Sequence, residues 1–291
     1  MGTRLTVPAV RARKVRAGGE PLVMLTAYDA PGARLATEAG VDMLLVGDSV
    51  AMAVLGYRDT LSVTIDDMVH HTAAVARGEP DALVVADLPW LSYHVSARDT
   101  ICNAARLVRA GAEAVKLEGG TRRVPMIEAL TAAEIPVMGH IGLTPQSVHA
   151  MGGFRVQGRT PEAAVEIAES AKALEHAGCF AIVLEGVPAD VAAIVTGAVD
   201  VPTIGIGAGP DCDGQVLVFH DVLGLQSDLQ PKFVRRYADL AAEAVDALAR
   251  FAADVRSGAF PSAQESYGMA AEQEPRALGA TAGAALGLCA R

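Results

Sequence analysis

Short apolar runs that each end in a polar side chain recur along this chain, and they constrain its fold more than any other feature. The run 44–46 is followed by Gly47, Asp48 and Ser49. A parallel strand that is buried on both faces gives such a run, and ligands bind at the carboxyl ends of parallel strands. Later runs end in the same way at Asp87, Glu118, His140 and Glu185. Helix capping explains one such carboxylate, but five polar ends in succession indicate a shared site.

The apolar runs alternate with segments that have helix start and stop signals, which predicts a (β/α) series. Between the first two runs, Asp29 suits an N-cap, Pro31 the first helical turn and Gly40 the position after the helix. The expected strands are residues 22–26, 43–47, 82–86, 114–117, 136–139, 180–184, 203–206 and 216–219. The chain has 291 residues, close to the ~250 typical of an eight-fold barrel. We therefore predict a single (β/α)8 TIM-type barrel over an open doubly wound sheet.

One catalytic domain is expected over residues 1–267, because no linker interrupts the (β/α) series. Its basic lead-in, residues 1–20, is expected to lie along the surface. A long amphipathic helix is predicted at roughly residues 231–257, and the Ala- and Gly-rich residues 268–291 are predicted to be a disordered tail. The segment 142–158 is a long Gly-rich loop, which is typical of a cover over a functional site.

The charge balance and the cysteines argue against several classes of function. There are 34 acidic and 24 basic residues and a formal net charge of -10, which disfavours nucleic acid or an anionic membrane as a partner. The four cysteines include no C-x-x-C pair, so neither a zinc site nor a disulfide framework is expected. The basic residues near the N-terminus are not followed by an apolar run, so a signal peptide is not expected, and no segment approaches the ~18 apolar residues of a membrane span. The expected location is the cytoplasm.

Asp48, Asp87 and Glu118 follow three neighbouring strands, so their carboxylates are expected to converge. Converging carboxylates repel one another unless a cation or protons lie between them. A ligand set of oxygens, without a Cys or His cluster, favours Mg²⁺ or Mn²⁺ over zinc. The open positions of such an ion suit a 2-oxo acid, bound through its carboxylate and its keto oxygen. The ion would polarise the carbonyl and stabilise an enolate.

Strand alternation places Lys116 and Glu118 on one face, since side chains at i and i+2 point the same way. They form either a structural ion pair or a site in which the lysine holds an anionic substrate oxygen and the glutamate helps to hold a metal. Glu185, after the sixth strand, is expected across the barrel from Asp48 and apart from the metal, where it is free to act as a base. A capping or salt-bridged glutamate is the alternative. His140 is either an anion donor or an ordinary loop histidine.

The order of motifs resembles the ketopantoate hydroxymethyltransferase (3-methyl-2-oxobutanoate hydroxymethyltransferase) family from about residue 6 to residue 267. The matching segments are 24–29 (MLTAYD), 45–49 (LVGDS), 66–72 (DDMVHHT), 85–89 (VADLP), 115–120 (VKLEGG), 139–146 (GHIGLTPQ), 152–159 (GGFRVQGR) and 204–209 (IGIGAG). The resemblance implies a (β/α)8 barrel, Mg²⁺, a homodecamer and the first committed step of pantothenate synthesis.

Position by position, the resemblance also implies roles for the candidate residues. The metal-site carboxylates, acting directly or through water, are Asp48, Asp87 and Glu118. The contacts with the oxo acid are Asp48, Ser49, Asp87, Lys116 and His140. Glu185 matches the proton acceptor.

The implied reaction starts from 3-methyl-2-oxobutanoate held by Mg²⁺. Glu185 removes the proton from carbon 3, the enolate attacks the methylene carbon of 5,10-methylenetetrahydrofolate, and hydrolysis gives 2-dehydropantoate. Three positions depart from the family pattern: Trp90, His94 and Gly186 stand where Phe, Gln and a larger residue are common. These departures bear on the size of the pocket and the position of the base, but they remove none of the implied groups.

Two other functions fit parts of the pattern. A metal-dependent lyase of the phosphoenolpyruvate/isocitrate-lyase type also uses an enolate in such a barrel, but it usually has a catalytic Cys in a lid loop. The long loops 49–64 and 142–158 contain no Cys, which counts against this reading. A non-catalytic binding barrel needs neither a base nor a metal set, and this chain retains both.

Overall fold

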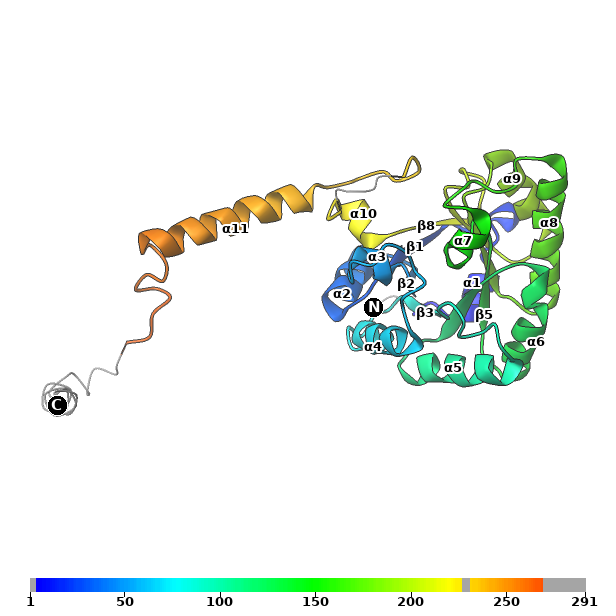
Figure 1. Cartoon of the computed structure of the whole chain (residues 1–291), viewed down its shortest axis with the longest axis horizontal. Helices are drawn as coiled ribbons and strands as arrows, with labels where there is room; N and C mark the ends of the chain where they lie inside the picture. The colour runs from blue at the N-terminus through cyan, green and yellow to red at the C-terminus, as the bar shows by residue number, and fades with distance from the viewer. Residues whose placement is uncertain (1–3, 227–230, 269–291) are drawn as a thin grey trace, which may run out of the picture. The chain divides into compact units, whose positions relative to one another are not determined.

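A closed barrel of eight parallel strands is the central feature of the computed structural model, which describes residues 4–226 and 231–268 (Figure 1). The strands follow one another around the barrel in sequence order, and the first pairs with the eighth. Their bounds are β1 Leu22–Thr26, β2 Met43–Val46, β3 Leu83–Asp87, β4 Ala114–Glu118, β5 Val137–Gly142, β6 Ala181–Glu185, β7 Thr203–Ile206 and β8 Gly214–Leu217. The predicted (β/α)8 barrel is confirmed. β1 and β7 have the predicted bounds, and the other strands are shifted by a few residues.

Helices cover the outside of the barrel, as Figure 1 shows for α2, α4, α5, α6, α8 and α9. Asp29 caps α2 as predicted, since its side chain accepts a hydrogen bond from the Gly32 N–H at 2.7 Å. The helical bounds are α1 Val7–Arg11, η1 Val15–Ala17, α2 Ala30–Glu38, α3 Val50–Ala53, α4 Ile65–Ala76, α5 Ala97–Arg109, η2 Thr121–Arg123, α6 Val124–Ala132, η3 Pro145–Ser147, α7 Val148–Met151, α8 Pro161–His176, α9 Ala189–Ala198, α10 Phe219–Leu223 and α11 Leu240–Ser257.

The chain divides into two compact units, Met1–Asp239 with the barrel and Leu240–Arg291 with α11. The long helix begins later than the predicted residue 231, and in the preceding segment the Tyr237 N–H donates to the Val222 carbonyl at 2.9 Å, which is not a helical hydrogen bond. The predicted tail lies outside the described residues, apart from its first residue, so the domain boundary at 267 stays a prediction. Within the described ranges, no helix is both long and apolar enough to span a membrane.

Side-chain alternation along the strands divides the buried residues into two layers. Leu44 and Val46 of β2 pack with Ala33 of α2 in the layer between the strands and the helices. Met43 and Leu45 point the other way and belong to a second cluster, which gathers alternate residues of the other strands and fills the barrel. The same alternation continues to the carboxyl ends of the strands, so it decides which polar side chains face the interior there.

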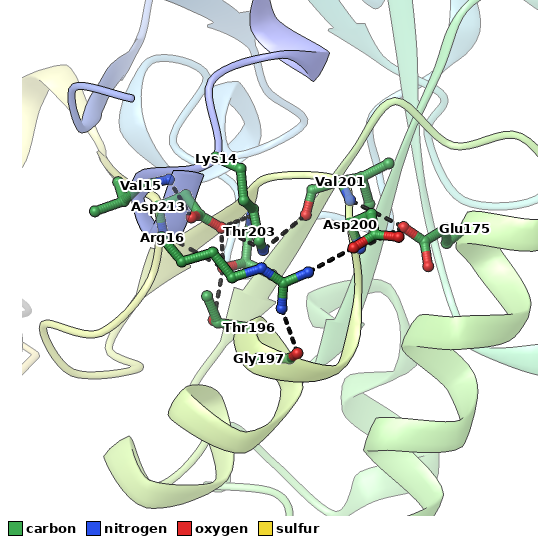
Figure 2. A network of polar contacts seen from close by, with 10 residues as sticks. All are labelled: Lys14, Val15, Arg16, Glu175, Thr196, Gly197, Asp200, Val201, Thr203 and Asp213. Carbon is green, nitrogen blue, oxygen red and sulfur yellow. Dashed lines mark hydrogen bonds and ion pairs between the residues drawn. The ribbon is translucent and has the colours of Figure 1, made fainter. Parts of the chain in front are cut away.

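The amino-terminal lead-in closes the opposite end of the barrel, contrary to the prediction that it lies along the surface. Val10 of α1 is fully buried and belongs to the cluster inside the barrel. Lys14 is also buried, and its Nζ donates to Asp213 Oδ2 at 2.7 Å and to the Val201 carbonyl at 3.0 Å (Figure 2). An open amino end would leave interior apolar side chains in water, which explains why the lead-in covers it.

Candidate active site

Polar side chains of neighbouring strands meet at the carboxyl end of the barrel. They are Asp48 after β2, Asp87 in β3, Lys116 and Glu118 in β4, His140 in β5 and Glu185 in β6. The strand residues among them face the interior because each shares its face, at the two-residue period of a strand, with interior apolar residues, as Asp87 does with Val85 and Glu185 with Val183. All six residues are buried except Glu185, which is partly exposed. The sequence therefore located the members of this cluster.

Lys116 pairs with Asp87 and not with Glu118. The Lys116 Nζ lies 2.9 Å from Asp87 Oδ1, and both side chains are buried. Strand register explains this choice, because Asp87 in β3 is the Cα partner of Lys116 in β4. Burial lowers the pKa of Lys116, but the charges of Asp87, Glu118 and Asp48 outweigh burial and raise it above its ordinary value. The lysine is therefore positively charged at neutral pH.

The carboxyl groups of Asp48, Asp87 and Glu118 share this buried site, as expected from their positions. The Asp48 N–H donates to Asp87 Oδ2 at 3.0 Å, which links the ends of β2 and β3. Burial, followed by the charges of Asp87 and Glu118, raises the pKa of Asp48 well above its ordinary value. Burial also raises the pKa of Asp87, although Lys116 opposes that shift. A cation bound beside these groups would lower both pKa values.

His140 lies between two glutamates. Its Nδ1 is 3.3 Å from Glu118 Oε1, and its Nε2 is 3.2 Å from Glu185 Oε2. Burial and the charge of Lys116 lower the pKa of His140, but the contacts with Glu118 and Glu185 outweigh them and raise it to about 9. The ring is therefore protonated at neutral pH. In this state the Lys116 ammonium, 3.3 Å from Nδ1, is a like-charged neighbour.

Glu185 is the most accessible carboxyl group of the cluster. Its side chain is 15% exposed, compared with 3% for Glu118. It ends β6, which lies opposite β2 in the closed barrel, so it stands across the mouth from Asp48 as expected. It is not isolated, however, because His140 joins it to Glu118. Within the described part of the chain, Glu185 Oε1 accepts no hydrogen bond, which leaves it available to a ligand.

Ser49 lies beside this cluster because Gly47 leaves space for its side chain. A Cβ at Gly47 would lie 2.7 Å from Ser49 Oγ and 3.6 Å from Asp87 Oδ2. The Tyr28 Oη is 2.8 Å from Ser49 Oγ, and burial raises the pKa of Tyr28, so the phenol stays protonated. The Ser49 hydroxyl is therefore held in place at the barrel mouth.

The charge balance of the cluster suits a divalent cation. The cluster has four carboxyl groups and two cationic groups. The carboxyl groups belong to Asp48, Asp87, Glu118 and Glu185, and the cationic groups belong to Lys116 and His140. When all four carboxyl groups are ionised, two negative charges have no counter-charge. Among the described residues, no group of three or more ligands converges on one ion position, and Asp48 Oδ1 accepts no hydrogen bond. This arrangement fits Mg²⁺, which is usually bound by one or two carboxylates and keeps several waters.

Two further residues of this site were not predicted from the sequence. Gln146 of η3 donates from Nε2 to Asp48 Oδ2 at 2.8 Å, and Tyr93 donates from Oη to Gln146 Oε1 at 2.6 Å. Both side chains are neutral and neither directly follows a strand, so a search for charges at strand ends does not find them. The only sequence signal for a role of Gln146 in this site is its position in the motif 139–146, which matches the family pattern.

The three departures from the family pattern have different surroundings. Gly186 has a φ of 54°, and a Cβ there would lie 3.2 Å from Leu143 Cβ, so a glycine suits this position. His94 packs against Tyr93 with ring centroids 4.2 Å apart, and burial lowers the pKa of His94 to about 4. Trp90 is 40% exposed. No hydrogen bond joins the three positions to the charged cluster in the described ranges.

Comparison with known proteins gives matches over nearly the whole chain. A family model described as Ketopantoate hydroxymethyltransferase matches residues 4–263. The 3-methyl-2-oxobutanoate hydroxymethyltransferase of Moorella thermoacetica is 57% identical over 266 residues, which cover 91% of this chain and 98% of that protein. The protein of the same name from Oleidesulfovibrio alaskensis is 56% identical over 279 residues, covering 95% and 96%. These matches therefore concern the entire barrel and not one motif.

Solved structures with similar folds are more distant in sequence. A crystal structure of phosphonopyruvate hydrolase in complex with oxalate and Mg²⁺ has a TM-score of 0.58 and 19% identity, and covers 90% of this chain and 93% of that one. The 2,3-dimethylmalate lyase of the PEP mutase/isocitrate lyase superfamily has a TM-score of 0.57 and 19% identity, with 99% and 97% coverage. At such low identity the likeness concerns the fold and does not favour a lyase activity.

Proposed function

The chain belongs to the ketopantoate hydroxymethyltransferase family, and on this premise we propose the full reaction that it catalyses. A hydroxymethyl group passes from 5,10-methylenetetrahydrofolate to 3-methyl-2-oxobutanoate, which gives 2-dehydropantoate in the first step of pantothenate synthesis. The observation that best supports this proposal is the cluster at the barrel mouth. It combines a surplus of buried carboxylates with the positive Lys116 and the accessible Glu185.

Asp48, Asp87 and Glu118 are the residues proposed to hold Mg²⁺, directly or through water. Their burial and mutual repulsion support this assignment, because a cation would relieve both costs. When bound, the ion polarises the substrate carbonyl and stabilises the negative charge that develops on the substrate.

The oxo acid is proposed to bind through two positive groups and one hydroxyl. Lys116 and the protonated His140 offer buried positive charge to its carboxylate and keto oxygen. Ser49 offers a hydroxyl that a buried tyrosine holds in place. Asp48 and Asp87 line the same site. Buried charge-assisted contacts of this kind are strong, so they orient a small anion tightly.

Glu185 is the proposed proton acceptor. Its Oε2 contacts His140 and its Oε1 is available, so the carboxylate is oriented while one oxygen faces no protein donor. Cleavage of the carbon 3–hydrogen bond moves the proton to Glu185 and leaves the electron pair in the enolate. Glu185 lies at the edge of the metal-site carboxylates, so that taking up a proton there does not remove a proposed metal ligand.

Carbon–carbon bond formation follows proton removal. Carbon 3 of the enolate bonds to the methylene carbon of 5,10-methylenetetrahydrofolate as one of the two carbon–nitrogen bonds of that carbon breaks and its electron pair passes to nitrogen. Water then replaces the second carbon–nitrogen bond and supplies the hydroxyl oxygen, and tetrahydrofolate leaves with both nitrogens protonated. The reaction involves no net oxidation or reduction, so it requires no redox cofactor.

The homodecamer that the sequence resemblance implies, and the cytoplasmic location expected from the sequence, are further parts of this proposal. Light scattering of the purified full chain tests the assembly directly. A mass of ten chains is expected, and a monomer would contradict the proposed assembly without bearing on the chemistry.

One assay tests the reaction. The full chain is incubated with 3-methyl-2-oxobutanoate and 5,10-methylenetetrahydrofolate, with Mg²⁺ or with a chelator, and 2-dehydropantoate is measured by mass spectrometry. Product is expected only when both the folate and the divalent ion are present. Product that forms equally in chelator would contradict the metal requirement. Cleavage of a 2-hydroxy dicarboxylate without hydroxymethyl transfer would support the lyase alternative.

A further inference from the structure

A glutamine in the loop after β5 connects two of the acidic side chains at the barrel mouth. Gln146 is buried, and its backbone N–H donates to Glu118 Oε2 at 3.0 Å. Its amide Nε2 donates to Asp48 Oδ2 at 2.8 Å and to the Leu88 carbonyl at 3.0 Å. One neutral residue therefore contacts carboxyl groups that come from two different strand ends.

Tyr93 determines the orientation of this amide. Its Oη lies 2.6 Å from Gln146 Oε1 and 3.1 Å from the Glu118 carbonyl oxygen, so the hydroxyl donates to Gln146 as the nearer acceptor, and it accepts from the Glu118 N–H at 3.1 Å. An amide has one acceptor oxygen and one donor nitrogen, so a hydroxyl that donates to Oε1 leaves Nε2 directed at Asp48. Tyr93 is itself fully buried, and the Arg123 guanidinium lies 5.4 Å from the centre of its ring. The amide thus has a partner on each side and cannot rotate without breaking these hydrogen bonds.

We propose that Gln146, oriented by Tyr93, is a positioning residue that holds Asp48 and Glu118 in the arrangement that binds the divalent cation. This inference rests on the proposed function. The hydrogen bond to Asp48 Oδ2 leaves Oδ1 as the oxygen without a donor from the described residues. Buried carboxylates repel one another, so fixed donors are needed to keep them close before a cation arrives. Removing a group that orients metal ligands typically weakens metal binding by ~10–100-fold.

The test compares Mg²⁺ binding by Gln146→Ala, Tyr93→Phe and the double variant, using calorimetry on the chelator-treated full chain. Gln146→Ala is expected to weaken binding by ~10–100-fold, and Tyr93→Phe by a smaller factor. The double variant is expected to bind no more weakly than Gln146→Ala alone, because the hydroxyl acts through the amide. Gln264→Ala, at an exposed glutamine, is the matched control and should bind as the wild type does.

A merely structural role of Gln146 gives a different pattern. Melting temperatures would then fall while the Mg²⁺ affinity stays at the wild-type value, or the losses of affinity would add in the double variant. Either result overturns the proposal. Tyr93→Phe preserves the volume of a buried ring, so unchanged affinity in this variant is decisive even where Gln146→Ala fails to fold. Wild-type protein that binds no Mg²⁺ would overturn the proposed metal site as well, whereas normal wild-type binding with unaffected variants overturns the role of Gln146 alone.

Discussion

Two buried lysine–aspartate ion pairs lie at opposite ends of the barrel, and they differ in what surrounds them. At the amino end, the Lys14 Nζ lies 2.7 Å from Asp213 Oδ2, and at the carboxyl end the Lys116 Nζ lies 2.9 Å from Asp87 Oδ1. All four side chains are buried. Because geometry and burial are alike, neither of them distinguishes a structural pair from a functional one.

The amino-end pair is complete by itself. Asp213 Oδ1 accepts from the Val15 N–H at 2.9 Å, and Oδ2 accepts from the Thr203 N–H at 2.9 Å as well as from Lys14 (Figure 2). One positive and one negative charge cancel, and each carboxylate oxygen has a protein donor. This ion pair therefore connects the lead-in to β7 and to the residue before β8. Its hydrogen bonds and charges are satisfied within the protein, so it offers no group to a ligand.

The carboxyl-end pair is surrounded by further carboxyl groups. Asp48 and Glu118 lie beside Asp87, and burial together with these charges raises the pKa of Asp48 well above its ordinary value. The comparison teaches that a buried ion pair indicates a functional site when its neighbours leave charge uncompensated, and indicates a structural role when they do not.

Glu185 is the proposed proton acceptor, so its removal should have the largest effect. Glu185→Gln is expected to lower turnover, and the exchange of the carbon 3 proton with D₂O, by ~10²–10⁴-fold, because an amide does not accept the proton. Calorimetry should show that Mg²⁺ and the oxo acid still bind. Glu169→Gln, at an exposed glutamate of α8, is the control. Exchange at the wild-type rate without product, measured by NMR, would show that Glu185 acts later in the reaction.

Replacing each lysine by Met tests the comparison directly. Lys14→Met is expected to lower the free energy of unfolding by ~3–5 kcal/mol, because it leaves Asp213 buried without its partner, while the folded enzyme keeps its turnover number. Lys116→Met is expected to lower turnover by ~10²–10³-fold, since it removes a buried positive charge from the substrate. Urea unfolding and steady-state kinetics measure the two effects. A turnover loss in Lys14→Met comparable to that in Lys116→Met would refute the distinction between the pairs.

The stability that the carboxyl-end cluster contributes should depend on pH. The pKa of His140 is raised from 6.5 to about 9, so the folded state binds this proton more tightly than the unfolded state. Its stabilisation is complete below pH 6.5 and is lost as the pH rises through 9, by about 3 kcal/mol in the metal-free protein. The raised pKa of Asp48 has an effect of the same sign, because the stability that its bound proton contributes is lost as the pH rises through that raised pKa.

Thermal melting in chelator as a function of pH measures this loss of stability. His140→Gln should flatten the dependence above neutral pH, and His149→Gln, at an exposed histidine, should not change it. An equally steep fall in the His140→Gln variant would assign the dependence to another group.

The smallest expected effect compares the aspartates. Asp48→Asn should raise the free energy of unfolding of the metal-free protein by about 1 kcal/mol, since it relieves charge repulsion, and should weaken Mg²⁺ binding. Asp213→Asn should instead lower the free energy of unfolding by ~1–3 kcal/mol, because it weakens a satisfied network. Urea unfolding in chelator reads both values. Destabilisation by both variants would show that the Asp48 charge is already compensated.

Most of the barrel could be predicted because its signals are local. Apolar runs marked the strands, and Asp29 marked the start of α2, where its carboxylate accepts the Gly32 N–H. The lead-in was predicted less well, since nothing in its basic sequence shows that Val10 enters the barrel or that Lys14 reaches Asp213. Covering the open end of a barrel is a requirement of the assembled fold and has no local signal.

The sequence by itself determined which residues of the candidate site lie at strand ends and which of them share a face, because the two-residue period of a strand is a property of its own backbone. Only the tertiary structure decided their partners. Strand register placed Lys116 beside Asp87, and the return of the loop after β5 brought Gln146 to Asp48, 98 residues away. The strand register and the path of the loop after β5 both depend on how distant elements pack around the closed barrel. No single segment of the sequence specifies that packing.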